Sequence, residues 1–266
     1  MPQTSVAQPG PSTFVVDTAV EGGDTDIGDG VCATAAGGCS LRAAVEESSS
    51  APGSTVQIPA GTYVLTEGEL DITADETTIQ GAAAPPGAAA STIQADGSGR
   101  VIDIAADDVV IAGVVVAGGD AGPGDGGGIR VGNNRSATVR DSTIVANTAR
   151  DGGGIDSRGT LTVERSTVAD NTANRKGGGI RNAGVATIDN TTITGNTADQ
   201  GGGVSSPGST AITHATIVQN DAVSSSGGGV ARNGGTLTIR HSIETGVSLP
   251  RWTVESTKYS RGFFRS

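Results

Sequence analysis

Aromatic side chains are scarce in this sequence. Only six of its 266 residues are aromatic, and none lies between Val64 and Arg251. The six residues are Phe14, Tyr63, Trp252, Tyr259, Phe263 and Phe264. A core without aromatic rings must be thin and built from valine, isoleucine, leucine and alanine, which excludes most large globular cores.

Basic residues are also scarce, because 17 lysines and arginines stand against 28 acidic residues and give a net charge of −11. Nucleic-acid and anionic membrane partners are therefore not expected, since both need clustered positive charge. No apolar run approaches the roughly 18 residues of a membrane-spanning helix, so no transmembrane segment is expected. Residues 1–12 lack the basic start and apolar stretch of a signal peptide.

Cysteine occurs only twice, as Cys32 and Cys39 in the stretch CATAAGGC. The glycines and alanines between the two residues permit a tight loop. Two interpretations are open: a disulfide in an exported protein, or two free thiols in a cytosolic protein.

Glycine is abundant, with 43 residues, and it follows a repeat. Glycine triplets recur about every 25 residues, and an isoleucine or valine follows each one; they begin at Gly126, Gly152, Gly177, Gly201 and Gly227. An asparagine recurs with the same period, at Asn147, Asn171, Asn196 and Asn220. A fixed period of this length indicates a solenoid.

Each repeat has the pattern of short strands. In TLTVERSTV, Leu161 and Val163 are two residues apart, which places both side chains on one face of a strand, and Val168 follows after a bend. Three short strands and three bends suit one coil of a parallel β-helix, and parallel crossovers are strongly right-handed. We therefore expect an all-β, right-handed parallel β-helix of roughly eight coils, from about Thr55 to Ile243.

The recurring asparagines and glycines are expected to have structural roles. Asn147, Asn171, Asn196 and Asn220 should stack at one bend, because asparagine tolerates left-handed backbone angles and its amide bonds neighbouring backbone. The glycine triplets should allow the chain to turn where a Cβ would clash.

A short helix is expected in CSLRAAVEESSS, with Ser40 as its N-cap. Leu41, Ala44 and Val45 share one face and should cover the open end of the first coil, whereas Glu46 and Glu47 are expected on the opposite face.

This stretch resembles the N-terminal module named after its Cys-Ser-Leu-Arg-Glu-Ala motif, which precedes right-handed β-helix repeats in bacterial exported and surface proteins. Cys39 to Arg42 match the motif, whereas Ala43 stands where the family usually has glutamate. The resemblance covers about residues 14 to 243, and its N-terminal motif is more specific than its repeats. It implies export, a bridge between Cys32 and Cys39, and a β-helix, but it assigns no catalytic residues.

The end of the sequence departs from the repeat. Glu244 stands where the pattern requires an aliphatic residue, and burial of an unpaired charge is costly. The expected organisation is a disordered segment 1–13, a cap module 14–54 with the capping helix, the β-helix 55–243, and an atypical tail 244–266. The tail is interpreted either as a basic, aromatic cap or docking arm, or as a truncated or frame-shifted end. An incomplete last coil offers an edge for self-association.

Acidic pairs are the candidates for catalysis, because glycoside hydrolysis generally uses two positioned carboxylates. Asp107 and Asp108 precede an apolar strand and are typical of an exposed bend. Asp120 and Asp125 lie in the glycine-rich stretch GGDAGPGDGGG, where their oxygens are candidate Ca²⁺ ligands. The coils lack the aromatic platforms that sugar sites normally offer, which argues against a carbohydrate enzyme.

His214 and His241 occupy equivalent positions in successive coils, so their rings should lie within contact distance and form a candidate two-histidine metal site. The same column contains charged and polar residues in earlier coils, which is also typical of a solvated bend.

Threonine rows suggest a third use of the fold. Outward Thr-x-Thr-like pairs resemble the flat faces of ice-binding β-solenoids, although Val185, Ser209 and Ala211 interrupt the rows; the pairs are Thr160 with Thr162, Thr236 with Thr238, and Ser136 with Thr138.

The sequence thus predicts a secreted or cell-surface β-helix protein without enzymatic activity, which has a structural, adhesion or ligand-presenting role toward surface glycans or proteins. The first alternative is a polysaccharide lyase or glycoside hydrolase acting on acidic polysaccharides, with Ca²⁺ as its candidate cofactor. The second alternative is an ice-binding β-solenoid.

Overall fold

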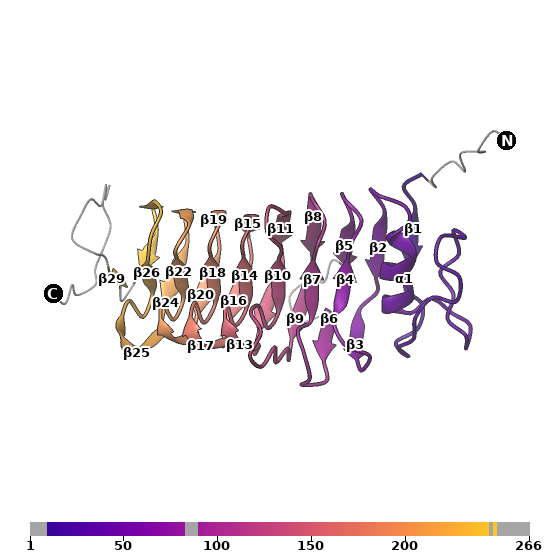
Figure 1. Cartoon of the computed structure of the whole chain (residues 1–266), viewed down its shortest axis with the longest axis horizontal. Helices are drawn as coiled ribbons and strands as arrows, with labels where there is room; N and C mark the ends of the chain where they lie inside the picture. Colours follow the sequence, from indigo (N-terminus) through magenta and orange to yellow (C-terminus); the bar gives the residue numbers. More distant parts are fainter. Residues whose placement is uncertain (1–9, 83–89, 245–246, 249–266) are drawn as a thin grey trace.

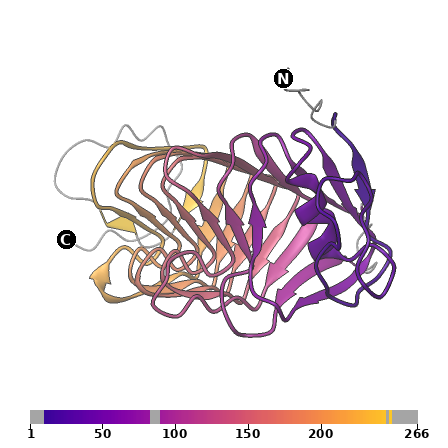
Figure 2. The ribbon, with the colours of Figure 1, turned by 45° about the vertical axis from the view of Figure 1, so that its right-hand side comes forward.

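The computed structural model describes residues 10–82, 90–244 and 247–248, and it is a long stack of β-coils with one helix at its N-terminal end (Figure 1). Seven coils run from β2 to β26, and the short strands β27 to β29 belong to an eighth. The turned view in Figure 2 shows successive coils lying side by side along the long axis. The prediction of a parallel β-helix with a short N-terminal helix is confirmed.

Parallel ladders join strands of successive coils into four sheets, numbered here in the order in which the chain meets them. Sheet 1 contains β1 (Thr13–Val15), β2 (Thr55–Ile58), β5 (Thr78–Gly81), β8 (Val109–Ala112), β11 (Ser136–Arg140), β15 (Thr160–Glu164), β19 (Val185–Asp189), β23 (Ser209–Thr213) and β27 (Leu237–Arg240). Sheet 2 contains β3 (Gly61–Leu65), β6 (Ser91–Ala95), β9 (Val114–Ala117), β12 (Thr143–Val145), β16 (Thr167–Ala169), β20 (Thr192–Thr194), β24 (Thr216–Val218) and β28 (Ile243–Glu244).

Sheet 3 carries the candidate functional groups discussed below. It contains β4 (Leu70–Ile72), β7 (Ile102–Ile104), β10 (Ile129–Val131), β14 (Ile155–Ser157), β18 (Ile180–Asn182), β22 (Val204–Ser206), β26 (Val230–Arg232) and β29 (Val247–Ser248). Among the described residues, sheet 4 begins in the fourth coil and contains β13 (Thr148–Asp151), β17 (Thr172–Lys176), β21 (Thr197–Gln200) and β25 (Asp221–Ser226).

The core consists of rows of aliphatic side chains, one residue from each coil in each row. In sheet 1, Val139, Val163, Ile188 and Ile212 pair in register and are fully buried. Sheets 2 and 3 contribute equivalent rows, so each coil places its apolar side chains over those of the coil beneath. Because one coil alone buries too little apolar surface to offset its loss of conformational entropy, stability depends on this stacking.

The recurring asparagines form a buried ladder at the bend after sheet 2. The Oδ1 atom of Asn171 accepts hydrogen bonds from the backbone N and from Nδ2 of Asn147, both at 3.0 Å. Oδ1 of Asn196 accepts the same two bonds from Asn171. Oδ1 of Asn220 accepts the same two bonds from Asn196. The left-handed angle lies on the residue before each asparagine, for example φ 54° at Asp170, rather than on the asparagine itself.

The glycine triplets form the corner that leads into sheet 3. The first glycine of each triplet is left-handed, as at Gly152 with φ 61°. The second glycine has no room for a side chain, because a Cβ on Gly153 would lie 2.4 Å from the carbonyl oxygen of Thr172. The triplets are therefore required by both backbone conformation and close packing between coils.

The N-terminal helix α1 (Leu41–Ser48) packs against β1, β2 and β4 and covers the first coil (Figure 1). Ser40 is its N-cap and accepts a hydrogen bond from the backbone N of Ala43. Cys32 and Cys39 form a disulfide, with their Cα atoms 5.1 Å apart. Within the described ranges, no helix combines the length and the apolar character needed to cross a bilayer.

The position of Glu47 on the polar face of α1 does not expose it to solvent. Its side chain is buried, and its carboxylate accepts hydrogen bonds from the backbone N atoms of Gly28 and Gly30, both at 2.6 Å. Glu46 accepts a bond from the backbone N of Asp24 at 2.7 Å. The polar face of α1 therefore binds the backbone of the loop that precedes the disulfide. A helical pattern in the sequence does not reveal this contact.

Parts of the two ends lie outside the described residues. Residues 1–9 of the segment expected to be disordered are outside them, whereas Ser12 bonds to Ser54 through its backbone N. Ile243 and Glu244 form the short strand β28, which pairs with β24 at the point where the repeat pattern fails. Residues 249–266 of the predicted tail lie outside the described part.

Candidate functional site

Charged residues form a continuous row on the outer face of sheet 3. The middle residue of each strand points away from the aliphatic core, and these residues pair in register from one coil to the next. In chain order the row contains Asp71, Asp103, Arg130, Asp156 and Arg181. Strands 4.7–4.9 Å apart bring such neighbours within ion-pair distance.

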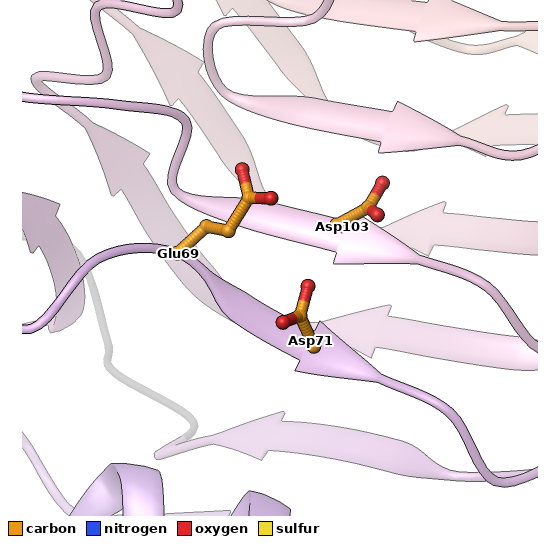
Figure 3. Close-up of side chains that lie close together, drawn as sticks. All are labelled: Glu69, Asp71 and Asp103. Carbon is orange, nitrogen blue, oxygen red and sulfur yellow. The ribbon is translucent and has the colours of Figure 1, made fainter.

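Three carboxylates converge at the N-terminal end of this row. Glu69 precedes β4, Asp71 lies on β4 and Asp103 lies on β7; one carboxylate oxygen from each lies within 4.8 Å of the others (Figure 3). Figure 3 shows all three side chains projecting from the same face of the sheet. Oxygen atoms in such a group are ligands that Ca²⁺ accepts.

Two arginines already neutralise much of this cluster. Arg130 binds Asp103 in a bidentate pair with distances of 2.6 and 2.5 Å. Arg100 contacts Glu69 at 2.7 Å and also donates to the backbone carbonyls of Asp125 and Gly126. Three carboxylates beside two guanidinium groups leave a net charge of only about −1 in the cluster. A bound cation is therefore not needed to neutralise it.

The pKa of Glu69 is raised above its ordinary value. Burial is the main cause, the neighbouring charges of Asp103 and Asp71 add to it, and the charge of Arg100 opposes it. A raised pKa at a clustered carboxyl is a feature of general acids as well as of crowded structural sites. At Glu69 the ion pair with Arg100 at 2.7 Å therefore offsets part of the effect of burial.

A second group of carboxylates lies further along the stack and is almost completely buried. Asp125 binds Arg150 at 3.0 Å and also pairs with Arg158. The equivalent pair one coil later is Asp151 with Arg175 at 2.8 Å, and on sheet 3 Asp156 pairs with Arg181 at 2.6 Å. Buried carboxylates need such partners, so these pairs account for the burial without a catalytic role.

None of the sequence candidates for catalysis belongs to the three-carboxylate cluster. Asp107 pairs with Arg135 at 3.1 Å, and Asp108 bonds to the Ser136 hydroxyl at 2.8 Å; both lie in the bend between β7 and β8. Asp120 is exposed and accepts a bond from the backbone N of Gly122, two residues further along the chain.

The remaining catalytic and Ca²⁺ candidate, Asp125, is held by Arg150 and Arg158. Within the described residues, the three-carboxylate group that meets metal-site geometry is Glu69, Asp71 and Asp103, which sequence reasoning missed.

The two histidines lie in contact, as their spacing predicts. The rings of His214 and His241 stack with centroids 5.2 Å apart and planes within 9°. Nδ1 of His214 lies 3.1 Å from Oδ1 of Asp189, which also accepts a bond from the Thr213 hydroxyl at 2.6 Å. The hydrogen bonds from Thr213 and His214 lower the pKa of Asp189.

The threonine rows lie on the outer face of sheet 1. Thr138, Thr162 and Thr187 pair in register, and Ala211 then interrupts the row. A second row on this face, which includes Thr160, is interrupted by the exposed Val185. A third row is mostly charged and contains Arg140, Glu164, Asp189, Thr213 and Arg240. This face is therefore narrower and more charged than a regular threonine array.

The arginine of the N-terminal motif has a clear structural role. Arg42 is buried and bonds to Glu21 and to the backbone carbonyls of Gly68 and Glu69. Burial would raise the pKa of the Glu21 carboxyl, but hydrogen bonds from Thr66 and Arg42 lower it overall. Arg42 thus links helix α1 to the segment just before β4, which includes Glu69 of the three-carboxylate cluster.

Comparison with known proteins gives only a likeness in fold. No family model and no curated protein matches the chain. Among solved structures, pectate lyase Pel9A aligns with a TM-score of 0.46 and 13% identity, over 96% of this chain and 75% of that one. Alginate lyase AlyF-OU02 in complex with G6 aligns with a TM-score of 0.29 and 13% identity, over 79% of this chain and 58% of that one.

Proposed function

We propose that this chain is a secreted or cell-surface β-helix scaffold without enzymatic activity, which presents its long faces to surface glycans or proteins. The observation that supports it is the pairing of the buried carboxylates on and beside sheet 3. Asp103, Asp125, Asp151 and Asp156 each contact a guanidinium group within 3.0 Å. A general acid or base must be available to the substrate, and these carboxylates are committed to structural ion pairs.

The arginines of the three-carboxylate cluster support the same proposal. Arg130 is held by both oxygens of Asp103, and Arg100 is held by Glu69 and two carbonyls. A lyase needs an unpaired base that can remove a proton from the substrate. Arg100 and Arg130 do not offer one, because each guanidinium group is paired with a carboxylate. The aromatic side chains among the described residues, Phe14 and Tyr63, are buried at the N-terminal end and offer no sugar platform.

A second candidate function is lysis or hydrolysis of acidic polysaccharides at Glu69, Asp71 and Asp103. The specific observation in its favour is that acids and arginines from several coils converge there, with a raised pKa at Glu69. In this alternative Ca²⁺ would bind the carboxylates, and Arg100 and Arg130 would lie beside an anionic substrate.

A cleavage and binding experiment separates the two functions. The protein is incubated with a panel of acidic polysaccharides, with and without Ca²⁺, while unsaturated and reducing-end products are followed. We expect no product, together with saturable binding to one or more immobilised glycans or surface proteins. Product formation that disappears in the Glu69→Gln/Asp71→Asn variant would establish the enzyme and refute the scaffold, and the Asp107→Asn/Asp108→Asn variant is the matched control.

A further inference from the structure

We propose that His214 and His241 bind one divalent transition-metal ion, with Zn²⁺ as the representative, and that this ion links the last two coils that the structure describes. The proposed role lies beyond the scaffold function and does not depend on it. Imidazole nitrogens favour zinc, copper and nickel over Ca²⁺ and Mg²⁺, so the site differs in chemistry from the carboxylate cluster on sheet 3.

The backbone brings the two rings together. Each histidine follows a strand of sheet 1, at the same position in successive coils, and each has a left-handed backbone, with φ 51° at His214 and 49° at His241. Identical backbone conformations on paired strands direct both side chains the same way, which explains the nearly parallel rings with centroids 5.2 Å apart. Zinc–nitrogen bonds of about 2.0–2.1 Å require the two ligating nitrogens to lie about 3.3 Å apart. In the stacked arrangement the nitrogen lone pairs lie in nearly parallel planes. Both exposed rings must therefore turn about their side-chain bonds until the two lone pairs converge on one ion.

Asp189 orients His214, one of the two proposed metal ligands. Its carboxylate lies 3.1 Å from Nδ1 of His214, and the Thr213 hydroxyl holds the same oxygen at 2.6 Å. A carboxylate at Nδ1 favours the tautomer with the proton on that nitrogen and leaves the Nε2 lone pair for a metal. Asp189 is thus a positioning residue that orients His214.

Among the described residues, no side chain or backbone group occupies the ring nitrogens of His241 that would bind the metal ion. No hydrogen bond or ion pair engages its ring there, and its side chain is exposed. The nearest cationic neighbour in sequence is Arg240, in the exposed charged row. This contrasts with Asp103 and Asp125, whose oxygens are occupied by arginines. Two solvent molecules would complete the four-coordinate geometry of a zinc ion held by two imidazoles.

The location gives the ion a structural consequence. His214 follows β23 and His241 follows β27, so a shared ion would join two coils beside their backbone ladder. In a solenoid each coil is stabilised by its neighbours, and a coil near an end has fewer of them. The bound ion is therefore expected to protect β27 from local opening.

Variants for the test are available from the same column of the fold. Asn190 occupies the equivalent position one coil earlier, with φ 49°, so His214→Asn and His241→Asn should keep the backbone unstrained. Arg165 occupies this column one further coil away, with φ 48°, and Arg165→Asn is the matched control.

Zn²⁺ binding to the untagged chain is measured by calorimetry in a non-chelating buffer at neutral pH, with Ca²⁺ in parallel. We expect one Zn²⁺ per chain, and at least about tenfold weaker binding in His214→Asn and in His241→Asn. Asp189→Asn should weaken binding by about tenfold, as is typical when the partner of a ligating histidine is lost. Arg165→Asn should bind as the wild type does. Wild-type affinity in both histidine variants, or no saturable Zn²⁺ binding, would overturn the proposal.

Histidine NMR provides a second test, because the chain contains only two histidines. Both imidazole signals should shift together and reach saturation at one Zn²⁺ per chain; a shift of only one signal would refute a shared site. Hydrogen exchange of the β27 amides should slow with Zn²⁺ in the wild type and remain unchanged in His241→Asn. Unchanged exchange in the wild type would refute the link between coils.

Discussion

Replacement of Asn171 by alanine tests the main stabilising device of the stack. Asn171 is fully buried, and its side chain makes four hydrogen bonds, all near 3.0 Å. Its Nδ2 donates to the Ile144 carbonyl and to Oδ1 of Asn196, and its Oδ1 accepts from the backbone N and Nδ2 of Asn147. Alanine removes all four bonds and leaves the buried backbone N of Asn147 without this partner.

The expected loss follows from these contacts. At a net value of about 1 kcal/mol for each bond, the four bonds amount to about 4 kcal/mol of the free energy of unfolding. The matched control is Asn174→Ala, an exposed asparagine in the neighbouring strand β17, for which a change within about 0.5 kcal/mol is expected.

Urea unfolding followed by far-UV circular dichroism measures both variants at neutral pH. We expect Asn171→Ala to unfold at a clearly lower urea concentration than Asn174→Ala, with helix α1 and the disulfide unaffected. If the two variants differ by less than about 1 kcal/mol, the ladder contributes no net stability, and the reasoning from its hydrogen bonds is refuted.

Three further predictions concern charge, close packing and the disulfide. Burial by itself raises the pKa of Asp125, but its two arginine partners lower it overall. Its stabilising contribution is therefore present above the unfolded-state pKa of about 4 and is lost as the pH falls through the lower folded-state pKa. Thermal midpoints should fall more steeply in acid for the wild type than for Asp125→Asn, and parallel profiles would contradict this. Gly153→Ala brings a Cβ against a carbonyl oxygen and should cost about 1–3 kcal/mol in urea unfolding. Gly10→Ala has open space and should cost almost nothing, so equal effects would argue against the packing explanation. Reduction of the Cys32–Cys39 bridge should remove about 2.5 kcal/mol and lower the Tm, whereas the Cys32→Ser/Cys39→Ser variant should be insensitive to reductant; a Tm that reductant leaves unchanged would refute this contribution.

The regular coils were predictable because their period is nearly constant. Once Gly152 and Gly177 are aligned, Val163 and Ile188 follow in the same frame, and the structure pairs them directly. The alternation of aliphatic and polar residues then gives the buried row of sheet 1. Sequence reasoning succeeds here because one spacing determines both the register and the face.

The charged row on sheet 3 was missed, although three of its five residues have a signal in the sequence. In each regular coil it is the residue after the first aliphatic that follows a glycine triplet, as Arg130, Asp156 and Arg181 show. Asp71 and Asp103 belong to earlier coils without triplets, where no marker aligns one coil with the next. Their convergence with Glu69 depends on a register that only the folded chain reveals.

The burial of Glu47 was not predictable from the helical pattern. Amphipathic patterns assume that the polar face of a helix meets water. Here the loop containing Gly28 and Gly30 packs over that face and supplies backbone donors. Such a loop has no periodicity, so its path over the helix is not visible in the sequence.

The asparagine ladder also gives the stack a direction. Asn147 donates to Asn171 and Asn171 donates to Asn196, so each bond between two asparagines runs from an earlier coil to a later one. A coil near the N-terminus therefore keeps a buried donor without its acceptor until the following coil is in place. The bonds between asparagines thus distinguish the two ends of the stack, because each Oδ1 in the ladder accepts from the coil before it.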